Sequence, residues 1–474
     1  MAPHPLDPIF HPRSVAVVGA SSKRGPASFV DHLIEQGCPR VYPVNPRGGE
    51  IAGLPVYPTL ASIPGPVDHV ISSIPASLVE PMLEEAGAKG VRSIHFFTAG
   101  FAETGEADRL ALQDRIVRRA GELGVRLVGP NCLGLYVPAS GLTFAGGCAK
   151  ESGPVAFWAQ SGTNANTAIY DGQLRGLRFS KVVSFGNAVD VNAAELCRYA
   201  LADPETEIVG TYIEGLPDAR DLFAALRALA AEKPVALLKG GMTQAGARST
   251  RSHTASLAGS AEIWRAAVAQ VNAVLVDSME EAIDMLVGWR YDAVPRGGRV
   301  ALVVGGGGVS VQGADDIAAA GLTLPDLSAA TAEALREITP IAGTSIRNPV
   351  DTQALWRGVG LAATLEAIAA DDHLDALIVQ AGHGWGAVSS PGDARKRQAR
   401  LLSELEQATP RLTEIGKPVA VVVPSSHEPA SARLNGELMQ QIVAAGYPAF
   451  GSIPAAARTL QRLDRWRARR EARG

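Results

Sequence analysis

Cysteine is scarce in this sequence, with four among 474 residues. These are Cys38, Cys132, Cys148 and Cys197, and they form neither a CxxC pair nor any other spacing that is typical of metal ligands. The sequence therefore predicts no metal site. Cysteines that are few and unpatterned in this way are typical of a protein from a reducing cytoplasm.

A strong charge of one sign and long apolar runs are also missing. The net charge of −4 creates no field that would attract nucleic acid or an anionic membrane, and the basic run at residues 465–473 is predicted to be a solvated terminal helix. No apolar run approaches the roughly 20 residues that a membrane helix needs. Residues 1–12 lack the pattern of a signal peptide. We therefore expect a cytoplasmic protein that binds neither nucleic acid nor membrane.

What the sequence does contain is enough apolar material for large cores, since 46% of the residues are hydrophobic. Three segments share one design: SVAVVGASS at 14–22, PVAFWAQSGT at 154–163 and RVALVVGGGGVS at 299–310. Each is an apolar run followed by Gly or Ser and then by a helical pattern, which predicts a buried parallel strand that turns into a helix.

Turn-forming residues cluster at 149–153 (AKESG) and at 292–298 (DAVPRGG), where we place two domain boundaries. The length suggests about three domains. Predicted strands and helices alternate throughout, which is typical of an α/β fold with mostly parallel sheets. The sequence therefore predicts three domains, at residues 1–150, 151–295 and 296–474.

Ligands of such sheets bind at the carboxyl ends of the strands. A Gly or Ser turn that opens a helix also presents free N–H groups and the positive end of the helix dipole to an anion. For any one turn alone, glycines that merely permit a tight turn are an equally good explanation. The candidate phosphate-binding residues in the second and third segments are Ser161, Gly162, Thr163, Asn164, Gly307, Gly308 and Val309.

Five loops of the first domain each follow a predicted strand, so they are expected on one rim of one sheet. The rim is rich in small residues and hydrogen-bond donors and has one cation, Arg47, which suits a long phosphorylated ligand. A solvated surface arginine is the alternative interpretation. The five loops are VGASS at 18–22, VNPRGG at 44–49, SSIP at 72–75, TAGF at 98–101 and GPNCLG at 129–134.

In the second domain a predicted strand at 209–213 ends at Glu214, an amphipathic helix follows, and a second strand at 235–238 leads to Gly240. One βαβ unit makes the two strands parallel. If they are neighbours, Glu214 and Gly240 emerge about 5 Å apart on one rim. The polar stretch after Gly240 contains His253, and an unstructured stretch of this length inside a domain is usually functional.

A carboxylate bonded to one ring nitrogen of a histidine fixes its tautomer and makes the other nitrogen a better nucleophile. A lone loop histidine is more often merely solvated, and a glutamate at a strand end is more often a surface or capping residue. The shared rim and the anion turn at Ser161 shift the balance. We therefore predict that His253 accepts a phosphoryl group and that Glu214 orients it.

The five first-domain loops, taken in order, resemble the CoA-binding domain of succinyl-CoA synthetase α subunits and of ADP-forming acetyl-CoA synthetases. SHTASLAG at 252–259 resembles the phosphohistidine loop of the NDP-forming acyl-CoA synthetases, and TYIEG at 211–215 resembles the strand whose glutamate holds that histidine. Residues 160–162, 182–190 and 348–351 match as well. The resemblance covers nearly the whole chain, in the domain order of the ADP-forming α subunit.

The resemblance implies a Rossmann-like CoA-binding domain followed by two flavodoxin-like domains. It implies that acyl-CoA, NDP and phosphate interconvert with a carboxylic acid, CoA and NTP through an acyl phosphate and phosphorylated His253, with Glu214 as the orienting catalytic partner. In the family, the helices after Ser161 and after Gly307 point together at the phosphohistidine. The CoA contacts it implies are Gly19, Ala20, Ser21, Ser22, Asn45, Pro46, Arg47, Ser73, Ile74, Pro75, Thr98, Ala99, Gly100, Asn131 and Cys132.

A nucleotide module is not evident, because no GxxxxGK(S/T) motif occurs. The chain stops where the family's ATP-grasp portion would begin, so the resemblance implies that ATP or ADP and Mg²⁺ bind through a separate ATP-grasp β subunit. A dimer or an α2β2 assembly is expected. The segment GHGWG at 382–386 could line an acyl pocket, although a structural role is the stronger interpretation.

Two rival functions stay open. One is a CoA-binding regulatory protein that keeps the fold without turnover, which the presence of both His253 and Glu214 disfavours. The other is an NAD(P)-dependent oxidoreductase that uses residues 14–25. Asn45 stands where such an enzyme would need an acidic residue to bind the ribose.

Overall fold

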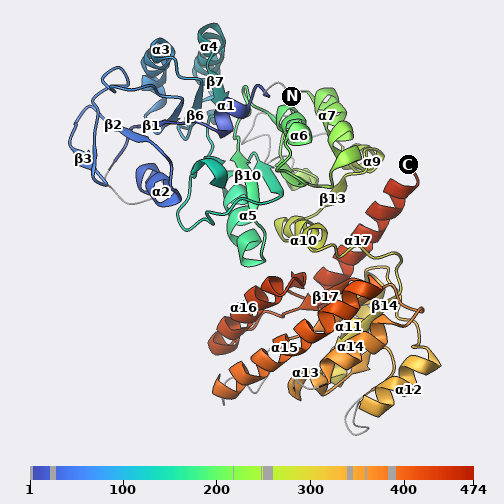
Figure 1. Cartoon of the computed structure of the whole chain (residues 1–474). Coiled ribbons are helices and arrows are strands. Elements are labelled where there is room, and N and C mark those ends of the chain that lie inside the picture. Colours follow the sequence, from blue (N-terminus) through green and yellow to red (C-terminus); the bar gives the residue numbers. More distant parts are fainter. Residues whose placement is uncertain are drawn as a thin grey trace. The chain divides into compact units, whose positions relative to one another are not determined.

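The computed structural model describes residues 4–21, 28–216, 218–246, 248, 260–338, 345–357, 360–382 and 391–473 (Figure 1). The chain forms two compact units. The first consists of Met1–Gln173 and Arg178–Ala282, and the second of Leu174–Leu177 and Ile283–Gly474. Within the described ranges, no helix has the length and hydropathy to cross a membrane.

The first sheet of unit 1 has five parallel strands in the order β2-β1-β5-β6-β7. Most of their residues are buried, as expected for a parallel sheet covered by helices. A small hairpin of β3 (Glu50–Ile51) and β4 (Leu54–Pro55) follows β2. The strands are β1 Val15–Val18, β2 Val41–Val44, β5 His69–Ser72, β6 Ser93–Phe96 and β7 Arg126–Val128.

Helices pack their apolar faces against this first sheet. Leu83 of one helix and Ile116 of another are buried in the same cluster as Val70 and Ile94 of the sheet. This core packs against the strands. Because the five strands are parallel, the loops at their carboxyl ends share one rim. The helices of this part of the chain are α1 Asp7–Phe10, which packs against Tyr199 of the second sheet's helices, and α2 Phe29–Gln36, α3 Val79–Lys89 and α4 Ala107–Leu123.

The second sheet of unit 1 has six strands in the order β13-β12-β11-β9-β10-β8, and only the pairing of β8 with β10 is antiparallel. The edge strand β8 lies within the range 1–150, so that range contributes to two sheets. The strands are β8 Gly134–Tyr136, β9 Val155–Ala159, β10 Phe179–Ser184, β11 Ile208–Ile213, β12 Val235–Lys239 and β13 Val274–Val276.

The βαβ unit that was predicted around Glu214 is confirmed. Strands β11 and β12 are parallel neighbours, with Ile213 opposite Lys239. Between them lies α7 (Ala219–Glu232), which Asp218 caps by accepting the N–H groups of Arg220 and Asp221. The predicted apolar face of α7 is buried. The other helices beside this sheet are α5 Gly162–Leu174, α6 Ala193–Ala202 and α9 Ala261–Gln270.

The stretch after Gly240 is not wholly irregular, contrary to the expectation from its polar composition. Residues 244–246 are helical, and the N–H of Gly246 donates to Thr243 Oγ1 at 3.0 Å. A polar helical turn buries little apolar surface, so hydrophobic periodicity gives no signal for it.

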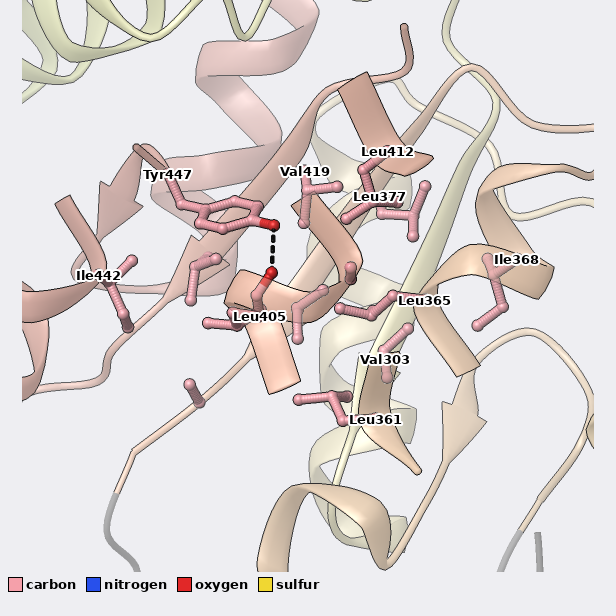
Figure 2. Close-up of a cluster of buried hydrophobic side chains, with 14 of the residues drawn as sticks. Val303, Leu361, Leu365, Ile368, Leu377, Leu405, Leu412, Val419, Ile442 and Tyr447 are labelled. Carbon is pink, nitrogen blue, oxygen red and sulfur yellow. Dashed lines mark hydrogen bonds between the residues drawn. The ribbon is translucent and has the colours of Figure 1, made fainter. Parts of the chain in front are cut away.

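Unit 2 has one parallel sheet in the order β15-β14-β16-β17-β18. Figure 2 shows its core, where Val303, Leu377 and Val419 of the sheet meet apolar side chains of the surrounding helices, and Tyr447 Oη donates to the carbonyl oxygen of Leu405 at 2.9 Å. The strands are β14 Val300–Val304, β15 Val350–Asp351, β16 Ala376–Gln380, β17 Val419–Val422 and β18 Ala449–Phe450.

The C-terminal helix of unit 2 differs in part from the expected solvated helix. Trp466 is buried and packs edge-on against Trp289, with ring centroids 5.5 Å apart. One face of the basic run is therefore part of the core. The helices of this part of the chain are α10 Met279–Arg290, α11 Gly307–Ala319, α12 Ala329–Ile338, α13 Ala354–Arg357, α14 Leu361–Ala369, α15 Pro391–Ile415, α16 Pro429–Ala444 and α17 Ile453–Glu471.

Candidate functional site

The first three predicted loops of the first sheet are tied to one another. Gly19 has φ +89°, and a Cβ there would lie 2.9 Å from the carbonyl oxygen of Ser73, so only glycine allows this approach. Asn45 Nδ2 donates to the carbonyl oxygen of Ala20 at 2.9 Å, and Asn45 Oδ1 accepts the N–H of Arg47 at 3.0 Å. These contacts fix the loops after β1, β2 and β5 as one surface.

The loops after β6 and β7 are joined in the same way. Thr98 Oγ1 donates to the carbonyl oxygen of Ile74 at 2.8 Å, and the N–H of Asn131 donates to the carbonyl oxygen of Thr98 at 3.0 Å. Cys132 is buried, and burial raises the pKa of its thiol far above the usual range. The Cys132 thiol is therefore neutral and packed inside the rim.

The predicted CoA contacts differ in how far they are exposed. Ala20, Thr98 and Cys132 are buried and serve the rim from inside. Ser22 lies outside the described residues. The exposed members, which form the outer surface of the rim, are Ser21, Pro46, Arg47, Pro75, Ala99 and Asn131.

Glu214 stands at the end of β11 and is held from several sides. Its Oε1 accepts a hydrogen bond from Tyr212 Oη at 2.9 Å. The N–H groups of Glu214 and Gly215 both donate to Gln160 Oε1, at 2.5 and 2.9 Å. Burial, and next the charge of Glu214, raise the pKa of Tyr212, so the phenol stays a donor. The carboxylate is thereby presented in one fixed orientation.

Lys239 is a buried cation that no sequence motif singled out. Its Nζ donates to the carbonyl oxygens of Glu214, at 2.7 Å, and of Gly240, and it lies 5.3 Å from the centre of the Trp264 ring. Burial lowers the pKa of Lys239 to about 8, while Glu214 opposes that change. These two hydrogen bonds hold the carboxyl ends of β11 and β12 together, just before the polar stretch that contains His253.

The phosphate turn before α5 adjoins Glu214. Ser161 Oγ accepts the N–H of Asn164 at 3.3 Å and so caps the helix, while the N–H of Gln160 donates to the carbonyl oxygen of Tyr212 at 3.2 Å. The first amides of a helix have no partners within it and point outward from its start. The turn follows β9 and Glu214 follows β11, and these two parallel strands are neighbours in the sheet.

His253 lies outside the described residues, as do residues 383–386 of the GHGWG segment. The predicted site is thus described on the side of Glu214 and the Ser161 turn. Among the described residues, no group of three or more His, Cys, Asp or Glu side chains is arranged to hold a metal ion.

The third predicted turn, in unit 2, opens α11 after Gly306, which has φ +156°. A Cβ at Gly307 would lie 3.9 Å from Asp351 Oδ2, and Gly308 has open space around it. Asn348 accepts the N–H of Leu302 at 3.1 Å, which anchors the NPVD segment beside this strand. The turn is accessible, and a carboxylate stands near it.

Within unit 1, the rims of the two sheets meet. The N–H of Leu133, in the last loop of the first sheet, donates to Ser184 Oγ of β10 at 3.0 Å. A Cβ at Gly162 would lie 2.7 Å from Leu133 Cγ, so the GPNCLG loop packs directly on the start of α5. Sequence reasoning missed this contact, because it joins residues that are far apart in the chain.

The comparisons with known proteins agree with this geometry. Residues 13–138 match the family described as CoA binding domain, and residues 152–287 match that described as succinyl-CoA ligase like flavodoxin domain. The chain is 34% identical over 409 residues to the ADP-forming acetate–CoA ligase II subunit alpha of Pyrococcus furiosus, covering 86% of this chain and 89% of that one. The chain belongs to the ADP-forming acetate–CoA ligase α-subunit family.

A second relative in this family of acid–thiol ligases is the ADP-forming acetate–CoA ligase I subunit alpha of Pyrococcus furiosus, with 30% identity over 469 residues and 97% of each chain covered. The dinucleotide forming acetyl-coenzyme A synthetase 1 of Ca. Korarchaeum cryptofilum, solved in complex with phosphate and ADP, has a TM-score of 0.78 at 27% identity, and the match covers 98% of this chain and 97% of that one.

Membership in the family confirms the resemblance drawn from the motifs and the predicted α/β fold with CoA-binding and flavodoxin-like domains. It favours neither the regulatory protein nor the oxidoreductase. The chain spans about half of some relatives: it covers 54% of the ADP-forming acetate–CoA ligase I of Archaeoglobus fulgidus, at 34% identity.

Proposed function

We propose that this chain is the α component of an NDP-forming acyl-CoA synthetase that interconverts acyl-CoA, NDP and phosphate with a carboxylic acid, CoA and NTP. The observation that supports this most is the contact between Leu133 and Gly162. Leu133 belongs to a loop of the CoA rim, and Gly162 opens the helix whose amides would hold phosphate. An acyl phosphate formed beside the CoA rim would therefore lie next to the phosphate turn and near Glu214.

The first chemical step needs phosphate and a thioester side by side. A phosphate oxygen attacks the thioester carbonyl carbon, the carbon–sulfur bond breaks, and CoA leaves as a thiolate that takes up a proton. Helix N-termini stabilise phosphate charge through free N–H groups. We assign this role to Ser161, Gly162, Thr163 and Asn164 and, in unit 2, to Gly307, Gly308 and Val309.

In the second step a ring nitrogen of His253 attacks the phosphorus of the acyl phosphate, and the carboxylate leaves. Such transfers depend mainly on positioning and electrostatics. Glu214 would accept the hydrogen of the other ring nitrogen and so hold one tautomer. Tyr212 keeps the Glu214 carboxylate in place through the 2.9 Å hydrogen bond, and Lys239 fixes the backbone beneath it.

The last step moves the phosphoryl group from His253 to NDP. We propose that a separate ATP-grasp subunit supplies the ATP or ADP site with its Mg²⁺, in a heteromer that works in the cytoplasm. Two observations support a partner: the relatives in Pyrococcus furiosus are called alpha subunits, and a relative in Archaeoglobus fulgidus is about half as long again as this chain. In this proposal residues 1–150, 151–295 and 296–474 are the three domains.

The central claim can be tested with acetyl phosphate, which donates a phosphoryl group without nucleotide or partner. Labelled acetyl phosphate should give the chain an acid-labile label, and His253→Ala should remove it. His373→Ala is the matched control, because the His373 side chain is 58% exposed and lies in unit 2. Label that survives His253→Ala would refute the phosphohistidine. A chain that binds no CoA in calorimetry would refute the CoA assignment.

A further inference from the structure

Glu103 joins two parts of unit 1 through its two carboxylate oxygens. It lies in the short helix Ala102–Thr104, directly after the TAGF loop of the first sheet. Its Oε1 accepts the N–H groups of Gly100 at 2.6 Å and of Phe101 at 3.1 Å. Its Oε2 accepts a hydrogen bond from Asn187 Nδ2 at 2.7 Å. One carboxylate therefore shapes a loop of the CoA rim and bonds a side chain from the second sheet.

Asn187 belongs to the loop that follows β10, and this loop is fixed at both ends. The N–H of Phe185 donates to the carbonyl oxygen of Ala159 at 3.0 Å, which places the start of the loop beside the phosphate turn. The N–H of Asn187 donates to the carbonyl oxygen of Pro130 at 3.0 Å, in the last loop of the CoA rim. The loop thus runs from the rim of the second sheet to the rim of the first.

The middle of this loop leaves no room for adjustment. Gly186 has φ +47°, and the carbonyl oxygens of Pro130 and Asn131 occupy the place that a Cβ would need. A rigid loop holds the Asn187 amide in one place, so the position of Asn187 determines where the Glu103 carboxylate can lie. Glu103 in turn determines the direction of the Gly100 and Phe101 amides.

We propose that Glu103 and Asn187 are a positioning pair that sets the TAGF loop for CoA binding from the second sheet. This inference rests on the proposed function, because it assumes that CoA binds the first rim. Neither residue contacts the reacting atoms. The pair instead fixes the positions of the exposed Ala99 and its neighbour Gly100 on the rim. CoA therefore binds a preformed surface whose geometry depends on that of the phosphate turn.

The polarity of the pair allows a sharp test. Glu103→Gln replaces one acceptor oxygen with an NH2 group, and Asn187 can answer this change by turning its amide oxygen toward it. Asn187→Asp places one carboxylate against another at the same distance. Combining the two substitutions restores one donor and one acceptor, with their roles reversed. All three variants keep the original side-chain shapes, so packing is preserved. Gln113, whose Oε1 also accepts from Asn187 Nδ2 at 3.2 Å, can turn its amide to suit either partner.

The experiment measures the dissociation constant for CoA by calorimetry with the full chain, alongside thermal unfolding of every variant. Asn187→Asp should weaken CoA binding about tenfold, as expected when a hydrogen bond to a charged group is lost, whereas Glu103→Gln should weaken it less than about threefold. The double variant should bind CoA within about threefold of the unaltered chain. Glu106→Gln is the matched control, since it makes the same change at an exposed glutamate nearby, and it should leave CoA binding unchanged.

The outcomes separate this inference from the function on which it rests. If the unaltered chain binds CoA and Asn187→Asp binds it equally well, the positioning role is wrong. If the double variant is as weak as Asn187→Asp, the pair does not act through its hydrogen bond, and the inference also fails. If the unaltered chain binds no CoA, the proposed function fails together with this inference.

Discussion

At the scale of single residues, Glu214 shows how the fold prepares a carboxylate before any ligand arrives. Its backbone is held by Gln160 and Lys239, and its side chain by Tyr212. These contacts come from paired strands and from the residue that follows β9, so little conformational freedom is left to lose if Glu214 binds His253 as we propose. Preorganised groups of this kind give catalysis its precision at small cost during the reaction.

Tyr212→Phe tests this preparation. The substitution keeps the ring and removes the hydroxyl that donates to Glu214, so the carboxylate gains freedom and, in the proposed mechanism, would hold His253 less well. We expect about threefold to tenfold slower labelling from acetyl phosphate, with a loss of about 1 kcal/mol in the free energy of unfolding. Labelling rates and urea unfolding measure the two effects.

Tyr170→Phe is the control for this change, because the partly exposed Tyr170 donates to the carbonyl oxygen of Gly146 at 2.8 Å and does not contact Glu214. Equal labelling rates for Tyr212→Phe and the unaltered chain would show that Glu214 needs no help from the phenol.

At the scale of elements, strands β5 and β6 bring together two buried histidines. The rings of His69 and His95 are stacked with centroids 6.4 Å apart. Burial, and next the neighbouring His95, lower the pKa of His69 to about 3, and burial lowers the pKa of His95 to about 4. Both rings are therefore neutral in the folded chain at neutral pH. They make the first sheet sensitive to acid.

The sign of this sensitivity follows from proton binding. A histidine in an unfolded chain has a pKa of about 6.5. Between pH 6.5 and pH 4, His69 and His95 therefore bind protons in the unfolded chain but stay neutral in the folded chain. The free energy of unfolding must therefore fall as the pH falls through this window, by up to about 1.4 kcal/mol per pH unit for each histidine. His69→Gln should remove one such contribution.

Urea unfolding at several pH values between 4.5 and 6.5 checks this expectation. The curve of unfolding free energy against pH should be shallower for His69→Gln than for the unaltered chain. Parallel curves would mean that His69 titrates in the folded chain much as it does in the unfolded one.

At the same scale, the sequence predicts elements better than it predicts their partners. The strands that end at Ser72, Ile213 and Val304 could be recognised because apolar runs bounded by turn residues are local signals. The position of Glu214 on the rim followed from the βαβ rule. The three-residue edge strand β8 could not be recognised, since so short a segment shows no alternation.

The long-range polar contacts could not be predicted either, because they leave no local signal in the sequence. Glu103 and Asn187 are 84 residues apart, and Arg126 pairs with Asp190 and Glu195 across a similar gap. No periodicity or spacing connects such residues before the chain folds. Lys239 was missed because a lysine at the end of an apolar strand usually marks the surface, whereas here it is buried.

At the scale of the whole molecule, the chain passes between the two units more than once. Residues 174–177, at the end of α5, group with unit 2, and the chain then returns to unit 1. Within unit 2, Arg175 pairs with Asp284 at 2.6 Å and donates from Nε to the carbonyl oxygen of Ala449 at 3.0 Å. The side chains of this ion pair are 9% and 2% exposed, so water screens it little.

Arg175→Met should therefore be costly. It leaves the Asp284 carboxylate buried without its cation, for which we expect a loss of about 3–5 kcal/mol in the free energy of unfolding. Arg175→Met combined with Asp284→Leu removes both charges and should recover much of that loss. Urea unfolding checks both variants, and a double variant less stable than Arg175→Met would contradict the argument.

The segment 187–191 has a consequence for how such proteins can be recombined. Strand β7 is the edge of the first sheet, and this segment runs along it, with the N–H of Val191 donating to the carbonyl oxygen of Leu127 at 3.2 Å and Asp190 paired with Arg126. Edge strands are open to pairing unless something covers them. In a hybrid that exchanged only residues 1–150 with those of a relative, β7 and the segment 187–191 that covers it would therefore come from two different proteins. We therefore expect residues 1–150 to be exchanged with less disturbance when residues 187–191 are exchanged with them.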